Sequence, residues 1–140
     1  MREILFRGKR VDNGEWIEGD LLNYLGWGKV HIAQNYKGAG GQEVVSKTVG
    51  QYTGLTDKNG KKIFEGDIVE VSRYKEKDLV CFGEHDISCC GCCYSYHHTI
   101  GFYLTNDNST NVFAEEESWS DLEIIGNIHD NPELLKEVNE

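Results

Sequence analysis

The chain has 140 residues, with 14 Lys or Arg against 24 Asp or Glu, which gives a formal net charge of −10. This length suits a single domain with a core of its own. The chain contains no run of 18 apolar residues, so no membrane span is predicted. The N-terminal sequence MREILFRGKR lacks the apolar segment of a signal peptide, so we expect a cytoplasmic protein that makes no membrane contact.

The acidic excess lies entirely in the second half of the chain. Residues 1–72 contain ten basic and ten acidic side chains, whereas residues 73–140 contain four basic and 14 acidic ones. Because nucleic-acid binding requires clustered Lys and Arg, this distribution disfavours direct DNA or RNA binding. The acidity fits either a general role in solubility or an acidic surface that meets a basic partner.

The first third of the chain predicts β hairpins. Glu3 to Phe6 and Trp16 to Leu22 have the composition of strands, and the turn residues Asp12-Asn13-Gly14 lie between them. Trp27 to Ile32 predicts a further strand. We therefore expect residues 1–48 to form N-terminal β hairpins.

The central stretch from Val49 to Val71 reads VGQYTGLTDKNGKKIFEGDIVEV. Asp57 to Gly60 supplies turn residues that tolerate positive φ, and Glu65-Gly66-Asp67 predicts a second tight bend. Ile68 to Val71 is a β-branched run that predicts a strand. We expect positive φ at the glycine of each turn.

A cysteine-rich segment over residues 79–99 is the chemically distinctive part of the chain. Two overlapping CxxC pairs predict a turn that can bring two thiolates to one zinc ion. We take one structural zinc, or no cofactor, as the two alternatives. The predicted ligands are Cys81, Cys89, Cys92 and His97, with His85, Cys90, Cys93 and His98 as alternatives.

The competing interpretation treats these cysteines as small apolar residues that line a hairpin. Five cysteines are an odd number, which argues against a closed disulfide framework. Because no CxxC pair occurs elsewhere in the chain to complete the usual two-knuckle pattern, the spacing alone leaves both alternatives open.

The C-terminal third predicts three strands, one of them the short Val112-Phe113, and a helix. Ile100 to Leu104 and Leu122 to Ile128 have strand composition, and Gly126 indicates a bulge or a close backbone approach. Asn131-Pro132-Glu133 is a helix start, followed by a helix over 132–138. So short a helix must pack against the rest of the domain to be stable.

Three segments resemble the YopX family, small proteins of bacteriophages and prophages. They are Val49–Val71, the C-terminal LEIIGNIHDNPELL from Leu122 to Leu135, and the N-terminal MREILFRGKRVDNGEWIEGDLL. The resemblance implies one mainly β domain over residues 1–140, in which residues 49–140 form an SH3-like roll or barrel with a Cys-rich insertion and a C-terminal helix. It implies no known activity, so no catalytic residues carry over.

No GxSxG, HExxH or P-loop motif is present, and we therefore expect no enzyme. Our hypothesis is a phage accessory protein that acts as a non-catalytic interaction module. Its partner would be a host or phage protein, or a second copy of the chain. The alternatives are a zinc-binding structural module and an acidic DNA mimic that inhibits a host nucleic-acid-binding protein.

Overall fold

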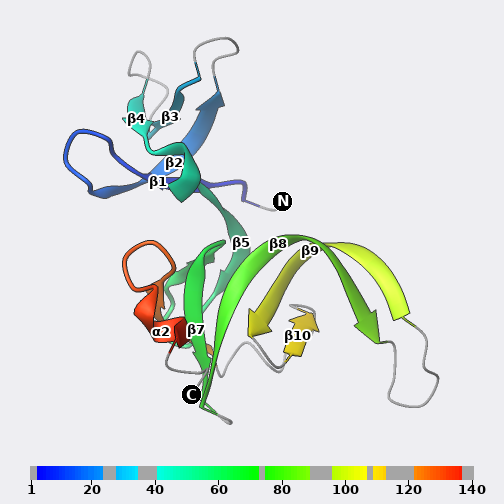
Figure 1. The fold of residues 1–140 in the computed structure, drawn as a ribbon. Coiled ribbons are helices and arrows are strands. Elements are labelled where there is room, and N and C mark those ends of the chain that lie inside the picture. Colours follow the sequence, from blue (N-terminus) through cyan, green and yellow to red (C-terminus); the bar gives the residue numbers. More distant parts are fainter. Residues whose placement is uncertain are drawn as a thin grey trace. The chain divides into compact units, whose positions relative to one another are not determined.

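The computed structural model describes residues 3–23, 28–34, 41–72, 75–88, 96–106, 109–112 and 122–136 (Figure 1). These residues form two antiparallel sheets, one turn of 3-10 helix and one short α-helix. The predicted mainly β class is therefore confirmed, although the described strands do not close into a complete barrel. The chain divides into two compact units, an N-terminal unit Met1–Gly54 and a C-terminal unit Leu55–Glu140.

The N-terminal unit contains five strands and the 3-10 turn η1. The strands are β1 (Phe6–Lys9), β2 (Trp16–Asn23), β3 (Val30–Ala33), β4 (Gln42–Val44) and β5 (Gly50–Thr56), and η1 covers Ser46–Thr48. They lie in the order β4-β3-β2-β1-β5, and β5 continues into the C-terminal unit, where β6 is its neighbour. The unit boundary lies within β5, six residues beyond the division at 48/49 that the sequence indicated.

The N-terminal sheet curls until its edge strand β4 meets the end of β1. The Val11 amide donates to the Glu43 carbonyl at 3.0 Å, and the Val45 amide donates to the Lys9 carbonyl at 2.8 Å. Gly8 permits this approach, because a Cβ there would lie 3.0 Å from the Val44 Cβ. The curl encloses a small core formed by Ile17, Ile32 and Val44.

Strand β1 begins three residues later than the sequence predicted, at Phe6 rather than Glu3. The strand covers the residues whose backbone pairs with its neighbours, since Phe6 to Lys9 pair with β2 and Phe6 and Arg7 also pair with β5. Phe6 and Gly8 face the core, and alternation places Arg7 and Lys9 on the opposite face of the strand. The Arg7 guanidinium lies 4.7 Å from the Trp16 ring centroid and the Lys9 ammonium 5.6 Å from it. This cation–π packing makes two charged residues compatible with the strand.

The C-terminal unit places a five-stranded sheet against the end of β5 and the short strand β6. Its core consists of the buried residues Ile63, Val69, Val80, Leu104 and Leu122. The sheet order is β10-β9-β8-β7-β11. The bounds are β6 (Lys62–Phe64), β7 (Asp67–Val71), β8 (Glu76–Ser88), β9 (Tyr96–Asn106), β10 (Ser109–Val112), β11 (Leu122–Asn127) and α2 (Glu133–Lys136).

The predicted turn over Asp57 to Gly60 is present and is attached to β11. One oxygen of the Asp57 carboxylate accepts hydrogen bonds from the amides of Asn59 and Lys61, both at 2.9 Å. The other oxygen accepts from the Ile124 amide of β11 at 3.1 Å. Gly60 has φ +82, as predicted for this turn. A buried carboxylate with three backbone donors thus joins two segments that are far apart in sequence.

The predicted bend at Glu65-Gly66-Asp67 is confirmed as well, with Gly66 at φ +93. The Asp67 carboxylate is buried and accepts a hydrogen bond from the Phe64 amide at 2.8 Å. The Gly66 amide donates to the Val80 carbonyl at 2.9 Å, and the Gly66 carbonyl accepts from the Ile128 amide at 2.8 Å. This bend therefore fixes β8 and the end of β11 to each other.

Gly126 combines both roles that the sequence left open. The β11–β7 register shifts between Ile124 and Gly126, which marks a bulge. A Cβ at Gly126 would also lie 2.7 Å from Asn131 Oδ1 and 2.9 Å from Leu134 Cδ1, so the glycine permits a close approach. Helix α2 packs there through Leu134, and its described turn Glu133–Lys136 is shorter than the predicted 132–138, whose last two residues lie outside the described residues.

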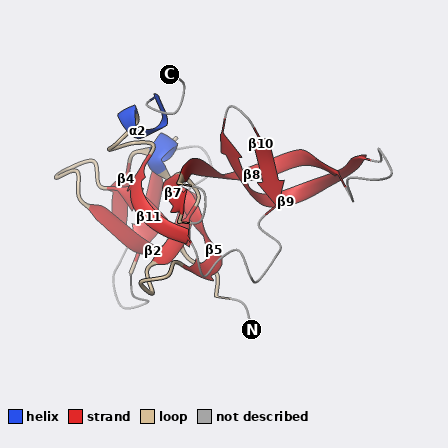
Figure 2. Cartoon of the chain, turned by 90° about the horizontal axis from the view of Figure 1, so that it is seen from below, coloured by secondary structure: helices blue, strands red, loops and turns tan. Residues whose placement is uncertain are grey.

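The longest element of the C-terminal unit is the β8–β9 hairpin, which arches away from the rest of that unit (Figures 1 and 2). Its ladder runs from Leu79 opposite Thr105 to Ser88 opposite Tyr96. Strand β7 pairs with β8 only as far as Leu79, and β10 pairs with β9 only from Tyr103 onward. Within the described residues, positions 82–88 and 96–102 thus form a two-stranded ribbon, called the ribbon below.

Asp57→Asn should destabilise the C-terminal unit by about 1–3 kcal/mol at pH 7, because an amide cannot accept all three hydrogen bonds. Burial raises the pKa of the Asp57 carboxyl, but the amides of Ile124, Lys61 and Asn59 outweigh it and hold this pKa below its usual value. The ionised group therefore stabilises the fold above the unfolded pKa, and this contribution is lost as the pH falls through the lower folded pKa.

Urea unfolding at pH 7 and pH 3 measures this dependence. The difference in stability between wild type and Asp57→Asn should shrink on acidification. Asp12→Asn is the control, since Asp12 is an exposed carboxylate 2.6 Å from Arg10 and surface ion pairs contribute little. A difference that is equal at both pH values would contradict the assigned role of the Asp57 charge.

Gly60→Val should cost about 1 kcal/mol or more of stability, because a β-branched residue resists positive φ. A Cβ at Gly60 would meet no atom within 4 Å, so the cost comes from the backbone alone. Gly60→Asn should cost less, since asparagine tolerates this conformation. Thermal unfolding distinguishes them, and equal melting temperatures for the two variants would show that φ at this turn is not limiting.

Candidate functional site

Cys81, the first predicted zinc ligand, lies on β8 directly opposite Tyr103 of β9. Its thiol is free and half-buried. Burial raises the pKa of the Cys81 thiol, a hydrogen bond with Tyr103 opposes the rise, and the Glu65 carboxylate adds to it. Because a cysteine binds metal as the thiolate, a metal ion at Cys81 would have to displace the thiol proton.

The three candidate histidines lie farther out on the same hairpin. The register pairs are His85 with Thr99, Ile87 with His97 and Asp86 with His98. His97 is thus six residues along β9 from Tyr103, the partner of Cys81. At about 3.3 Å per residue this is roughly 20 Å of strand, so the backbone does not bring Cys81 and His97 together.

The remaining candidates, Cys89, Cys90, Cys92 and Cys93, lie outside the described residues. Among those that the structure describes, no group of three or more His, Cys, Asp or Glu side chains is placed to hold a metal ion. His85 and His97 are diagonal neighbours in the register, and such positions lie about 7–8 Å apart. The register thus favours the loop end of the hairpin for the predicted zinc site, which stays a prediction.

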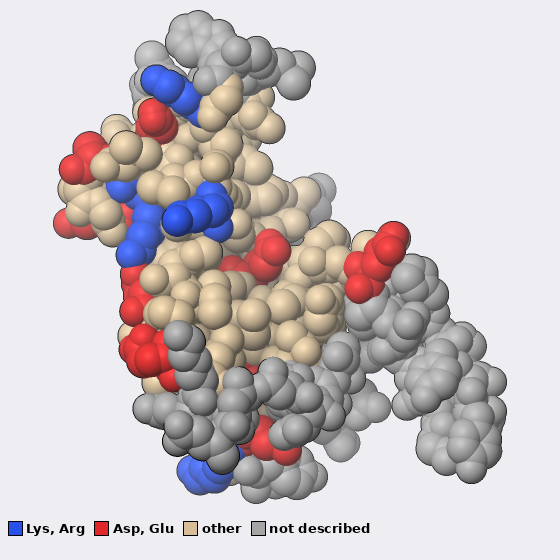
Figure 3. Space-filling model, in the orientation of Figure 1, with Lys and Arg blue, Asp and Glu red and all other residues tan. Residues whose placement is uncertain are grey.

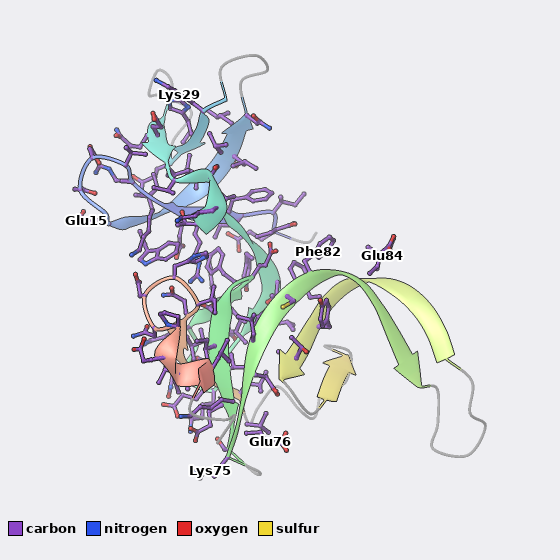
Figure 4. The ribbon with its side chains drawn as sticks, in the orientation of Figure 1. Glu15, Lys29, Lys75, Glu76, Phe82 and Glu84 are labelled. Carbon is purple, nitrogen blue, oxygen red and sulfur yellow. The ribbon has the colours of Figure 1, made fainter. Side chains whose placement is uncertain are left out.

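A second feature of the hairpin is an exposed apolar surface that the sequence analysis missed. Phe82 and Phe102 are register partners whose ring centroids lie 4.9 Å apart in an edge-to-face arrangement with 65° between the ring planes. The next pair on the same side is Glu84 with Ile100. Phe82 is 50% exposed and Ile100 65% exposed. These four side chains are called the ribbon face below, and Figure 4 shows Phe82 and Glu84 projecting from one side of the arch.

The ribbon face continues a surface that is buried nearer the core. Val80 and Leu104 are register partners on the same side of the hairpin, and both are core residues. Phe102 packs against that core, whereas Ile100, two residues farther along β9, is mostly exposed. The alternating apolar residues Ile100, Phe102 and Leu104 correctly predicted a strand. They are also the signal that was overlooked, because the alternation continues beyond the reach of the core.

Between the Phe82 and Glu84 pairs, the opposite side of the ribbon carries two glycines. Gly83 and Gly101 are register partners, and a Cβ at either one would meet no atom within 4 Å. Gly83 has φ +155, a conformation that other residues rarely adopt. Glycines at this level permit the bend of the arch. Between Phe82 and Glu84, the apolar side chains therefore lie on one side of the ribbon only.

The comparisons with known proteins agree with the sequence resemblance. The family model described as "YopX protein" matches residues 5–136. The chain belongs to the YopX family. That description names no activity and so assigns no catalytic residue. No curated protein matches the chain.

One solved structure similar to this YopX-family chain is titled "Crystal structure of protein EF1440 from Enterococcus faecalis". The two share 22% sequence identity and a TM-score of 0.49, over 96% of this chain and 99% of that one. No helix in the described part of the chain is long and apolar enough to cross a membrane.

The zinc hypothesis predicts about one zinc ion per chain in protein purified without chelator, with the metal lost from the Cys89→Ser/Cys92→Ser double variant. Because Cys81 is distant from the loop end, Cys81→Ser should retain the metal. Elemental analysis of the three proteins decides the matter. A metal-free wild type would mean that the cysteines are packing residues or surface thiols, and zinc loss in Cys81→Ser would place the site farther down the hairpin.

Proposed function

We propose that this protein is a non-catalytic interaction module of a phage or prophage and that the ribbon face binds a partner protein. The observation that supports this proposal is the exposure of Phe82 and Ile100 on a two-stranded ribbon that extends beyond its sheet. Exposed aromatic and aliphatic side chains that lie together characterise binding surfaces, whereas scattered ones are ordinary.

The distribution of exposed apolar residues supports the same surface. The described residues contain four large apolar side chains that are strongly exposed: Ile4, Val11, Phe82 and Ile100. Only the last two lie on adjacent register pairs of one hairpin. Aromatic residues are also enriched in the cores of protein interfaces.

The architecture of the ribbon gives a second argument. A two-stranded β ribbon on its own is only marginally stable in water. The described strands β7 and β10 support only the base of the hairpin. A bound partner would remove Phe82 and Ile100 from water and stabilise the arch.

The acidic DNA-mimic alternative rests on net charge alone. The C-terminal unit holds seven Lys or Arg and 18 Asp or Glu, a net charge of −11, against +1 for the N-terminal unit. Three of those carboxylates, Asp57, Asp67 and Asp78, are buried within the fold and are not displayed to a partner. A DNA mimic would also give no role to the apolar ribbon face, so we favour protein interaction.

Matched serine variants test the proposal. Ile100→Ser and Phe82→Ser remove ribbon-face residues, while Ile4→Ser and Val11→Ser are controls of similar exposure in the N-terminal unit, at 65% and 56%. The immobilised proteins are used to capture partners from a lysate of bacteria that carry the phage. Each captured protein is then purified and its affinity is measured by calorimetry, after circular dichroism has confirmed that every variant is folded.

We expect a partner that binds wild type and both controls equally and binds Ile100→Ser about tenfold more weakly or worse, as the loss of one buried aliphatic side chain requires. Capture that is absent, or that is unchanged in both ribbon variants, would refute the ribbon face as the binding surface. Binding that depends on Ile4 or Val11 instead would assign the function to the N-terminal unit.

A further inference from the structure

We infer that the ribbon face takes a segment of a partner protein that presents an apolar side chain flanked by Lys or Arg. This inference rests on the proposed function and adds the chemistry of the partner. It follows from the position of an apolar patch within the acidic unit of the chain. Figure 3 shows acidic side chains at several places on the face of that unit that it draws.

The acidic residues of the hairpin are not balanced by Lys or Arg. Residues 80–106 contain no Lys or Arg, and their only acidic residues are Glu84 and Asp86. Glu84 is exposed and lies directly opposite Ile100, so a carboxylate borders the apolar patch on its outer side. A partner placed over Ile100 would bring its own groups close to this carboxylate.

Electrostatics then decides between a second copy and a basic partner. Two copies stacked through their ribbon faces would bring two Glu84 carboxylates and two acidic units together, and like charges at an interface cost free energy. A segment with Lys or Arg beside its apolar residue would meet opposite charge at Glu84. Its cation would also lie near the rings of Phe82 and Phe102, where cation–π attraction is available.

The experiment uses two short fluorescent peptides and the full-length protein. In the first peptide Lys alternates with Ile or Val, and in the second Glu replaces each Lys. Anisotropy titrations of both peptides are performed in one buffer at about pH 7.5, where an unperturbed imidazole is largely neutral. Wild type, Glu84→Lys, Ile100→Ser and the control Ile4→Ser are compared.

Glu76→Lys is the matched charge control. Glu76 is an exposed glutamate on the same strand β8, at its opposite end, and its substitution changes the net charge of the protein by the same amount (Figure 4). We expect the Lys peptide to bind wild type on the order of tenfold more tightly than the Glu peptide. Glu84→Lys should abolish this preference, whereas Glu76→Lys should retain most of it.

Equal loss in Glu84→Lys and Glu76→Lys would show that only general acidity acts, and it would overturn the inference. Unchanged binding of the Lys peptide to Ile100→Ser would overturn it too, because the apolar patch would then make no contribution. Sedimentation velocity supplies the remaining outcome, since a dimer abolished by Ile100→Ser would identify a second copy as the occupant. Charge-independent capture of a partner through Ile100 would refute the basic segment while leaving the proposed function intact.

Discussion

The C-terminal unit depends on one buried carboxylate. Asp57 accepts three backbone hydrogen bonds, two within its own turn and one from Ile124, which lies 67 residues later in the chain. Burial of a charge is costly unless every lone-pair direction finds a donor, and here the donors belong to segments that meet only in the folded state. The turn therefore stabilises the edge strand β11 as well as the reversal between β5 and β6.

The second bend, at Glu65-Gly66-Asp67, connects β11 to the base of the β8–β9 hairpin. Gly66 is hydrogen bonded through its amide to Val80 of β8 and through its carbonyl to Ile128. This contact fixes the base of β8, and the ladder between β8 and β9 then sets the register outward to Ser88. The positions of Phe82 and Ile100 on one side of the arch follow from that register. Hydrogen bonds made at the core thus determine where the ribbon face lies.

Carboxylates serve two purposes in this unit. Asp57, Asp67 and Asp78 are buried, and the carboxylates of Asp57 and Asp67 accept backbone hydrogen bonds that shape tight turns. Glu84 is exposed and lies opposite Ile100, beside the apolar residues of the ribbon face. Net charge alone does not distinguish these uses, which is why acidity by itself supports several functions. The combination of an apolar surface with displayed acidity is more specific, because few partners satisfy both.

Local chemistry in the sequence determined the turns and most strands. Asn59-Gly60 and Glu65-Gly66-Asp67 predicted positive φ because only glycine adopts it without strain, and both glycines have it. Gly126 predicted an irregularity in β11, and family membership followed from the same motifs. These features depend on neighbouring residues, so they can be inferred without knowing the fold.

Only the tertiary structure determines which residues are exposed and which lie close together. Strand β1 starts at Phe6 because Phe6 to Lys9 are the residues that pair with β2. Cys81 and His97, close enough in sequence to suggest one metal site, were separated by the hairpin register. The alternation of Ile100, Phe102 and Leu104 predicts a strand face that is apolar throughout, but burial requires atoms on the other side. Only the fold shows that the core covers Leu104 and ends before Ile100.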